Sequence, residues 1–198
     1  SRRQRQMCIR DRGSLSYDQS KGSETGEKIF QTNLYHYAGT GHLAIDYAKL
    51  MRVGYDGLIN EAKDKLSKLS MRDPEYNDKR DFYEAMIIMH EAAKTYIERY
   101  ASLCEEKAKE EQDEKRKEEL LMMAENCHQI AGGTPQTFWQ AMQLFNIATT
   151  LIQVESNGHS ISYGRMDQWL YPYYEKDIKN GTITKEFALE LIEVEYVK

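Results

Sequence analysis

The stretch ESNGHSISYGRMDQ, residues 155–168, is the part of the chain where small, polar and ionisable residues cluster without helical periodicity. An apolar run from Phe138 to Val154 leads into it, and an aromatic segment from Trp169 to Tyr174 follows it. A polar loop held between two apolar elements is a common position for binding and catalytic groups. We therefore expect the chain to be organised around a candidate site in this stretch.

Alternation along this stretch predicts which side chains share a face. In an extended segment successive side chains point to opposite sides, so Asn157, His159 and Ile161 would face one way and Ser160 and Ser162 the other. A row of short hydroxyls suits a polar ligand because ordering such side chains costs little entropy. Turn chemistry, in which Ser and Asn bond their own backbone, is the alternative.

A second candidate lies at the start of the first predicted helix, which we expect from about Ala44. His42 follows the turn Gly39-Thr40-Gly41, and a helix N-terminus disfavours the charged imidazolium. A neutral His42 could bond a substrate hydroxyl, or it could be a packing residue. Asp46 would lie on the same helix face, although a carboxylate that interacts with the helix dipole is the preferred interpretation.

Composition excludes some classes of function. A net charge of −5 gives no support to nucleic-acid binding. No apolar run approaches the roughly 20 residues of a membrane span, and no secretory signal is visible. The three cysteines, Cys8, Cys104 and Cys127, lack a CxxC spacing, which favours reduced thiols. We expect a cytoplasmic protein.

The pattern predicts a mainly α fold with few short strands. Residues 1–27 are polar and predict a disordered or non-native tail, and 28–198 form one domain. An uncapped last helix indicates that this domain is truncated at its C-terminus. Helices are expected from about Ala44 with a break near Gly54 or Gly57, over Glu75–Ile130, from Thr134 (N-cap) to Val154, over Asp167–Asn180, and over Lys185–Lys198.

Three other features have plain structural interpretations. The charge run Glu105–Glu119 predicts a solvated helix face or the arm of a helical hairpin. Arg165 and Asp167 are expected to form an ion pair, with carboxylate binding by Arg165 as the minor alternative. Glu125-x-x-His128 has the spacing of half a di-iron site. The chain holds no second copy of that motif, so we expect no metal.

The same stretch carries a family resemblance. Residues 156–168, the lead-in 134–141, and the segments 39–47 and 54–58 resemble, in the family's order, the glycyl radical enzymes related to pyruvate formate-lyase. The resemblance runs from about Lys28 to Lys198. It implies the N-terminal helical portion of the family's α/β barrel.

The resemblance also implies roles for the candidate residues. In dehydratases of this family a His in the matching Gly-His motif contacts the substrate hydroxyl, and the Ser that matches Ser160 hydrogen-bonds the substrate. We therefore expect His42, Ser160, Asn157, His159 and Asp46 to contact a small-molecule substrate. No cofactor is expected to be bound. The full-length enzyme would carry a glycyl radical, installed by a radical SAM activating enzyme, and would form a homodimer.

Two motifs of the family are missing from the chain, namely the loop of the catalytic Cys and the loop of the radical Gly. We therefore expect an inactive N-terminal fragment of an anaerobic lyase or dehydratase that acts on a small hydroxylated metabolite. The motifs favour the hydroxyproline or glycerol dehydratase branch. Formate C-acetyltransferase (pyruvate formate-lyase) is one alternative, and a non-catalytic helical module that binds a partner through Glu105–Glu119 is another.

Overall fold

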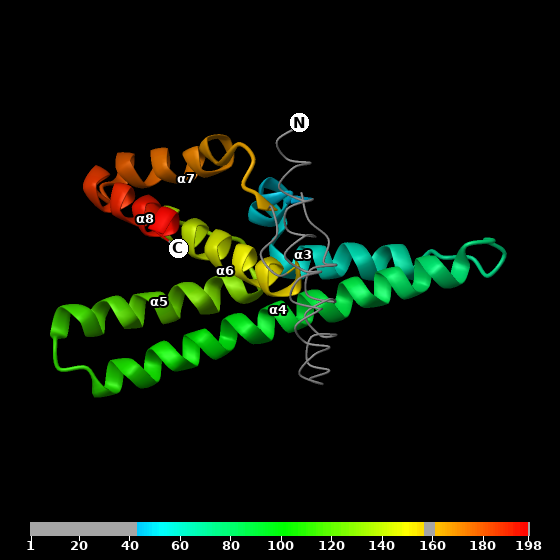
Figure 1. Ribbon diagram of the computed structural model, residues 1–198, viewed down its shortest axis with the longest axis horizontal. Helices are drawn as coiled ribbons and strands as arrows, with labels where there is room; N and C mark the ends of the chain where they lie inside the picture. Colours follow the sequence, from blue (N-terminus) through cyan, green and yellow to red (C-terminus); the bar gives the residue numbers. More distant parts are fainter. Residues whose placement is uncertain (1–42, 157–160, 198) are drawn as a thin grey trace, which may run out of the picture. The chain divides into compact units, whose positions relative to one another are not determined.

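A computed structural model describes residues 43–156 and 161–197 (Figure 1). The described part is mainly helical with two short strands, as predicted. The expected tail and the aromatic segment 28–40 lie outside the described residues. The chain divides into two units, and the larger one, Ala44–Leu151 with Tyr163–Lys198, contains nearly all of the described helices. The smaller unit includes the end of one helix and strand β2.

The elements follow one another along the chain as short strands and long helices. Their bounds are β1 Leu43–Ala44, α3 Tyr47–Ser67, α4 Tyr76–Glu110, α5 Glu114–Gly132, α6 Phe138–Ser156, β2 Ile161–Ser162, α7 Met166–Asn180 and α8 Lys185–Val197. The two strands pair in a two-stranded sheet. None of the helices in the described ranges is both long and apolar enough to cross a bilayer.

Helix α3 kinks at Gly54, which confirms the predicted break. Gly54 has φ 64° and ψ 179°, a conformation that is essentially restricted to glycine. A Cβ atom at this position would lie 2.6 Å from the carbonyl oxygens of Gly132 and Gly133 at the end of α5. The kink therefore lets the backbone of α3 approach the end of α5 more closely than any other residue would allow.

The long helix expected over Glu75–Ile130 is wrong in one respect, because the chain reverses between α4 and α5. Glu111 has an extended backbone at the end of α4. Asp113 then caps α5, since its side chain accepts hydrogen bonds from the amides of Lys115 and Arg116. The reversal makes an antiparallel hairpin (Figure 1), which confirms the hairpin interpretation of the charge run. Mostly small residues line the contact between its arms, where Cys104, Ala108 and Ala124 are buried together with Leu120.

Helix α6 is the centre of the main core and begins later than expected. Thr134 was predicted as its N-cap, but the helix starts at Phe138. Thr137 caps it instead, because its hydroxyl oxygen accepts the amide of Gln140 at 3.2 Å. The buried carboxylate of Asp177 accepts the amide of Phe138 at 2.7 Å. Side chains of α6 form much of the core, namely Phe138, Ala141, Met142, Leu144, Phe145, Ile147 and Ala148.

Helices α7 and α8 form a second hairpin. Helix α7 continues through Pro172 as predicted and ends at Gly181, which has the left-handed φ of 67° that suits a glycine C-cap. The hydroxyl oxygen of Thr184 then accepts the amide of Phe187 in the first turn of α8. This hairpin packs on α6 through aromatic pairs such as Phe138–Tyr174 and Trp139–Phe187.

Two glycine variants should distinguish the stability cost of steric overlap at the kink from the stability cost of a positive φ alone. Gly54→Ala combines a strained backbone with the steric overlap against α5, so we expect it to lower the free energy of unfolding by about 3 kcal/mol or more. Gly181→Ala has a positive φ but no atom within 4 Å of the added Cβ, so about 1–2 kcal/mol is expected. Urea unfolding followed by circular dichroism measures both values. Equal losses would contradict the close contact at Gly54.

Candidate functional site

The described residues bring together the two chain segments that the sequence predicted to form one site. Strand β1 begins with Leu43, the residue after His42, and strand β2 begins with Ile161, the residue after Ser160. The two strands are hydrogen-bonded neighbours, and neighbouring strands lie about 5 Å apart. His42, Asn157, His159 and Ser160 themselves lie outside the described residues, so their substrate contacts stay predictions.

Asp46 has a clear structural role. It is exposed and is the N-cap of α3, where its Oδ1 accepts the amide of Lys49 at 2.9 Å. Because the helix begins only at Tyr47, the predicted start near Ala44 is wrong. The preferred interpretation of Asp46, a carboxylate that interacts with the start of a helix, fits this geometry. Substrate contact by Asp46 stays a prediction.

A buried polar network lies beside Tyr163, the residue after β2. The side-chain amide of Asn146 on α6 donates to Oε2 of Glu195 on α8 at 2.5 Å. Glu195 is 6% exposed. Burial raises the pKa of Tyr163, and the charge of Glu195 and a hydrogen bond to it raise that pKa further. The network therefore ties the end of the 155–168 stretch to both α6 and α8.

The sequence interpretation missed Glu195, although a signal for it was present. Ala188, Ile192 and Glu195 stand at positions i, i+4 and i+7 of α8, which is the spacing of one helix face. The first two belong to the packed core of the molecule. A carboxylate on an apolar face requires a buried partner. The spacing could therefore have singled out Glu195.

A second buried pair joins the start of α3 to α6. The hydroxyl oxygens of Tyr47 and Thr149 lie 2.8 Å apart. The Thr149 hydroxyl donates its one proton to the carbonyl oxygen of Phe145 at 2.8 Å, so Tyr47 must be the donor in the pair. Burial raises the pKa of Tyr47 to about 12. Tyr47 is therefore a neutral hydrogen-bond donor at physiological pH.

Aromatic rings pack around these pairs. Tyr47 stacks on Trp169 with ring centroids 5.3 Å apart, and Phe145 contacts both rings and also Tyr163 edge to face. Trp169 is partly buried and packs against the core. Edge-to-face and offset pairs add about 0.5–1.5 kcal/mol each beyond area burial. The residues that follow β2 are therefore anchored to α3 and α6.

Arg165 and Asp167 form the predicted ion pair. Nε and Nη2 of Arg165 donate to the two carboxylate oxygens of Asp167 at 2.8 and 2.6 Å. Both side chains are more than half exposed. The guanidinium group holds the pKa of the Asp167 carboxyl below its usual range. The guanidinium group of Arg165 is thus already paired with Asp167. This pairing does not favour the alternative in which Arg165 binds a substrate carboxylate.

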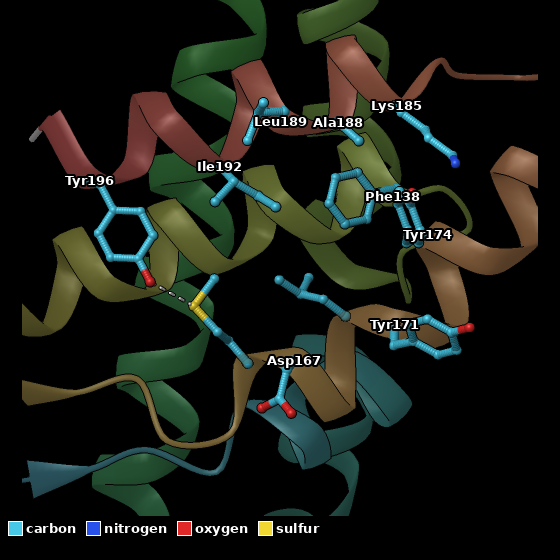
Figure 2. A pocket seen from close by; sticks show the side chains of 11 residues that line it. Phe138, Asp167, Tyr171, Tyr174, Lys185, Ala188, Leu189, Ile192 and Tyr196 are labelled. Carbon is cyan, nitrogen blue, oxygen red and sulfur yellow. Dashed lines mark hydrogen bonds between the residues drawn. The ribbon is translucent and has the colours of Figure 1, made fainter.

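A groove of about 450 Å³ lies between α7 and α8 beside the start of α6 (Figure 2). Its two charged residues, Asp167 and Lys185, lie at opposite edges in this view. The hydroxyl of Tyr196 donates to the sulfur of Met166 at 3.7 Å across the groove. Most of the wall is apolar or aromatic, formed by Phe138, Met166, Leu170, Tyr171, Tyr174, Ala188, Leu189, Ile192 and Tyr196. The polar groups of this groove are therefore not gathered around one place where a ligand could bind.

His128 belongs to a cluster at the surface of the α4–α5 hairpin. Its Nδ1 lies 2.8 Å from Glu98 and its Nε2 lies 3.0 Å from Glu105. Both ring nitrogens are donors only in the imidazolium form. The hydrogen bonds to Glu105 and Glu98 raise the pKa of His128 above 6.5. Within the described ranges, no group of three His, Cys, Asp or Glu side chains is arranged to hold a metal ion.

The two cysteines of the hairpin are packing residues. Cys104 and Cys127 are both buried and free. Burial raises the pKa of both thiols, and that of Cys127 reaches about 11. Such thiols are largely protonated at physiological pH.

Comparison with known proteins now assigns the chain to a family. The model of the pyruvate formate lyase-like family matches residues 12–198. The chain belongs to that family. This confirms the resemblance that the 155–168 stretch and its lead-in motifs carry. The mainly helical fold with few strands is shared with solved members of the family.

Three relatives of this pyruvate formate lyase-like chain show how the similarity is distributed. The (2S)-3-sulfopropanediol dehydratase of Klebsiella oxytoca is 74% identical over 93% of this chain. The B12-independent glycerol dehydratase of Clostridium butyricum has a TM-score of 0.76 and 44% identity over 82% of the chain. The hydroxyproline dehydratase of Clostridioides difficile has a TM-score of 0.76 and 31% identity over 80%. The chain spans 22% of the first relative and 20% of each of the other two.

Removing the carboxylate of Glu195 should destabilise the support of the candidate site. Glu195→Ala removes the carboxylate that accepts the side-chain amide of Asn146 and leaves a space in a buried position, so we expect the free energy of unfolding to fall by about 1–3 kcal/mol. Glu193→Ala, two residues away on the exposed side of α8, should change it by less than about 0.5 kcal/mol. Urea titration measures both. An unchanged stability in Glu195→Ala would contradict the role of the network.

The hairpin should lose stability as pH rises. Because the folded-state pKa of His128 is raised above 6.5, its contribution is fully present below that value and is lost as pH rises through the folded-state pKa. The effect is modest, since the side chains are about half exposed. We expect the stability difference between the chain and His128→Gln to shrink as the pH rises from about 6.5 through the raised pKa of His128. A difference that is independent of pH would contradict the cluster.

Proposed function

We propose that these residues form part of the substrate pocket of a glycyl radical dehydratase that acts on a short vicinal diol carrying a sulfonate group. The observation that carries this proposal is the 74% identity, over 93% of the chain, to a (2S)-3-sulfopropanediol dehydratase. Identity to the glycerol and hydroxyproline dehydratases is lower, at 44% and 31%. The chain spans 22% of that relative, so the activity belongs to the proposal for the whole protein.

The reaction class fits the chemistry of the substrate. Loss of one hydroxyl as water from a terminal vicinal diol gives an aldehyde. A radical enzyme of this family begins by removing a carbon-bound hydrogen atom with a thiyl radical, which a glycyl radical generates from a thiol. A radical SAM activating enzyme would install the glycyl radical. The thiol and glycine motifs are absent from this chain, so its residues would bind and orient the diol.

The role proposed for His42 and Ser160 is to hydrogen-bond the diol hydroxyls. The pairing of β1 with β2 supports it, because the residues that follow these two side chains lie in neighbouring strands. Short polar groups from two segments that converge on one place can fix a small diol by several hydrogen bonds. Asn157 and His159 are proposed to line the same wall. Positioning of this kind can lower a reaction barrier substantially.

The buried network holds the residues that follow β2 in the chain. Tyr163 follows β2 directly and is held by the Glu195 carboxylate and by its ring contact with Phe145. Groups that bind substrate need support from rigid elements, because a displacement of about 1 Å reduces activity strongly. The ion pair Arg165–Asp167 adds a local constraint just after this point. A homodimer of the full-length protein is part of the same family-level proposal.

Dehydration of an uncharged diol such as glycerol is the second candidate. The observation that favours it is the 44% identity and the TM-score of 0.76 with the glycerol dehydratase. Formate C-acetyl transfer has less support, because the three relatives described above are dehydratases. The partner-binding module has no added support, since the hairpin charges pair with one another, as in Arg116–Glu119 and Lys117–Glu114.

Substrate competition in the whole protein tests the proposal. We expect the anaerobically activated full-length enzyme to convert 3-sulfopropanediol with a kcat/KM at least about tenfold above that for glycerol. The measurement is aldehyde formation over a concentration series of each diol. A preference for glycerol would select the second candidate, and absence of an aldehyde with either diol would refute both.

Two serine variants test the proposed site. Ser160→Ala removes one hydrogen bond to the diol, so we expect kcat/KM to fall about 10- to 100-fold. Ser102→Ala removes a hydroxyl that donates to the carbonyl of Glu98 on exposed helix α4, and it should leave activity unchanged. Equal activities in the two variants would remove Ser160 from the site without affecting the assignment of the substrate.

A further inference from the structure

Ser162 is the exposed side chain of strand β2. Along the chain Ile161 is half-buried, Ser162 is exposed and Tyr163 is half-buried. This alternation is that of an extended segment, in which successive side chains point to opposite faces. Tyr163 packs against the hydrophobic core. The side chain of Ser162 therefore points away from the core.

The residues that follow Ser162 hold it in this orientation. The Tyr163 hydroxyl forms a hydrogen bond with the Glu195 carboxylate, and its ring meets Phe145 edge to face with centroids 4.9 Å apart. Gly164 then has a φ of 64°, which glycine adopts readily and which turns the chain towards α7. Because Tyr163 is anchored on the core side, the direction of the side chain before it is fixed as well.

Ser162 is also the hydrogen-bond donor that this segment presents on its exposed side. Among residues 161–164 it is the exposed side chain that can donate. The next donor along the chain is Arg165, whose guanidinium group is paired with both carboxylate oxygens of Asp167. A serine hydroxyl is a short donor, and ordering it costs little entropy. It is therefore suited to a group that can only accept hydrogen bonds.

The position of Ser162 in the chain relates it to the proposed diol site. It stands two residues after Ser160, and two residues of chain span at most about 7 Å in any conformation. A substrate with three carbons, a diol at one end and a sulfonate at the other, is long enough to reach two groups with this separation. The sulfonate end of that substrate would then lie at Ser162.

We propose that the hydroxyl of Ser162 donates a hydrogen bond to the sulfonate group of the substrate and contributes to the preference for a sulfonated diol. This inference rests on the proposed function and deepens it, because it assigns a residue to the sulfonate end. An ionised sulfonate has three acceptor oxygens and no donor. Hydrogen bonds to an ionised acceptor are about twice as strong as neutral ones.

The same contact would discriminate against uncharged diols. A site that hydrogen-bonds one group of a substrate rejects an analogue that lacks the group, because its own polar atoms are then left unpaired. Glycerol has a hydroxyl where the sulfonated diol has its sulfonate, and a neutral hydroxyl accepts a weaker hydrogen bond. The residue at position 162 should therefore affect the two candidate substrates to different extents.

Turnover of two substrates by the activated full-length enzyme tests the proposal. We expect Ser162→Ala to lower kcat/KM for 3-sulfopropanediol about 10- to 100-fold and to leave kcat/KM for glycerol nearly unchanged. Ser162→Asp places a like charge beside the sulfonate and should lower the first value at least about 100-fold. Ser160→Ala should lower both values, since both substrates are diols, and Ser102→Ala is the control that should change neither.

Inhibition by two partial substrates tests the same contact without turnover of glycerol. Propane-1-sulfonate carries only the sulfonate end and 1,2-propanediol carries only the diol end. As competitive inhibitors of 3-sulfopropanediol conversion, they should differ in Ser162→Ala. The inhibition constant of propane-1-sulfonate should rise about tenfold, and that of 1,2-propanediol should not change. An equal rise for both inhibitors would show a general effect on the pocket and overturn the proposal.

The possible failures are distinguishable. Absence of aldehyde from 3-sulfopropanediol with the unmodified enzyme would refute the proposed function. Undiminished conversion of 3-sulfopropanediol by Ser162→Ala would overturn only the assignment of Ser162. Circular dichroism should show unchanged helicity in both variants of Ser162, because its side chain is exposed. Loss of helicity in both would contradict that exposure and also overturn the assignment.

Discussion

The buried carboxylate of Asp177 determines where the central helix begins. It is 2% exposed, and its Oδ2 accepts the amide of Phe138, a residue 39 positions earlier. The first amides of a helix lack partners within the helix, and a negative charge there is favourable. This one bond ends the loop before α6 and holds α7 against it. Since α7 starts at Met166, the end of the 155–168 stretch is held to the core as well.

The core around that hydrogen bond contains polar pairs as well as apolar side chains. Helix α6 places its apolar side chains in the core, yet Asn146 and Thr149 on the same helix are polar. Each is bonded across the core, Asn146 to Glu195 and Thr149 to Tyr47. A buried polar group without a partner would be costly, whereas satisfied pairs give a core a single arrangement. The residues that follow β2, beginning with Tyr163, therefore pack against a core with specific polar pairs.

The apolar groove between α7 and α8 is concave and brings aromatic side chains together at the start of α6. Exposed apolar patches of this type mark interaction surfaces.

Local patterns in the sequence determined much of this protein. Apolar periodicity located the helices and Gly54 marked the kink, because these signals act within a few residues. The motifs around residues 155–168 indicated the family. The ion pair of Arg165 with Asp167 was also predictable, since the two residues are neighbours in the chain.

Tertiary structure decided the features that depend on distant partners. Thr134 has the local signature of an N-cap, but the contact with Asp177 moved the start of α6 to Phe138. The reversal at Asp113 was hidden inside a continuous run of helix-forming residues, because only packing of α5 back on α4 reveals it. Glu195 became part of the site's support through Asn146, 49 positions away. Such contacts join residues that are far apart in the sequence. Local sequence patterns therefore do not predict them, and only folding brings the residues together.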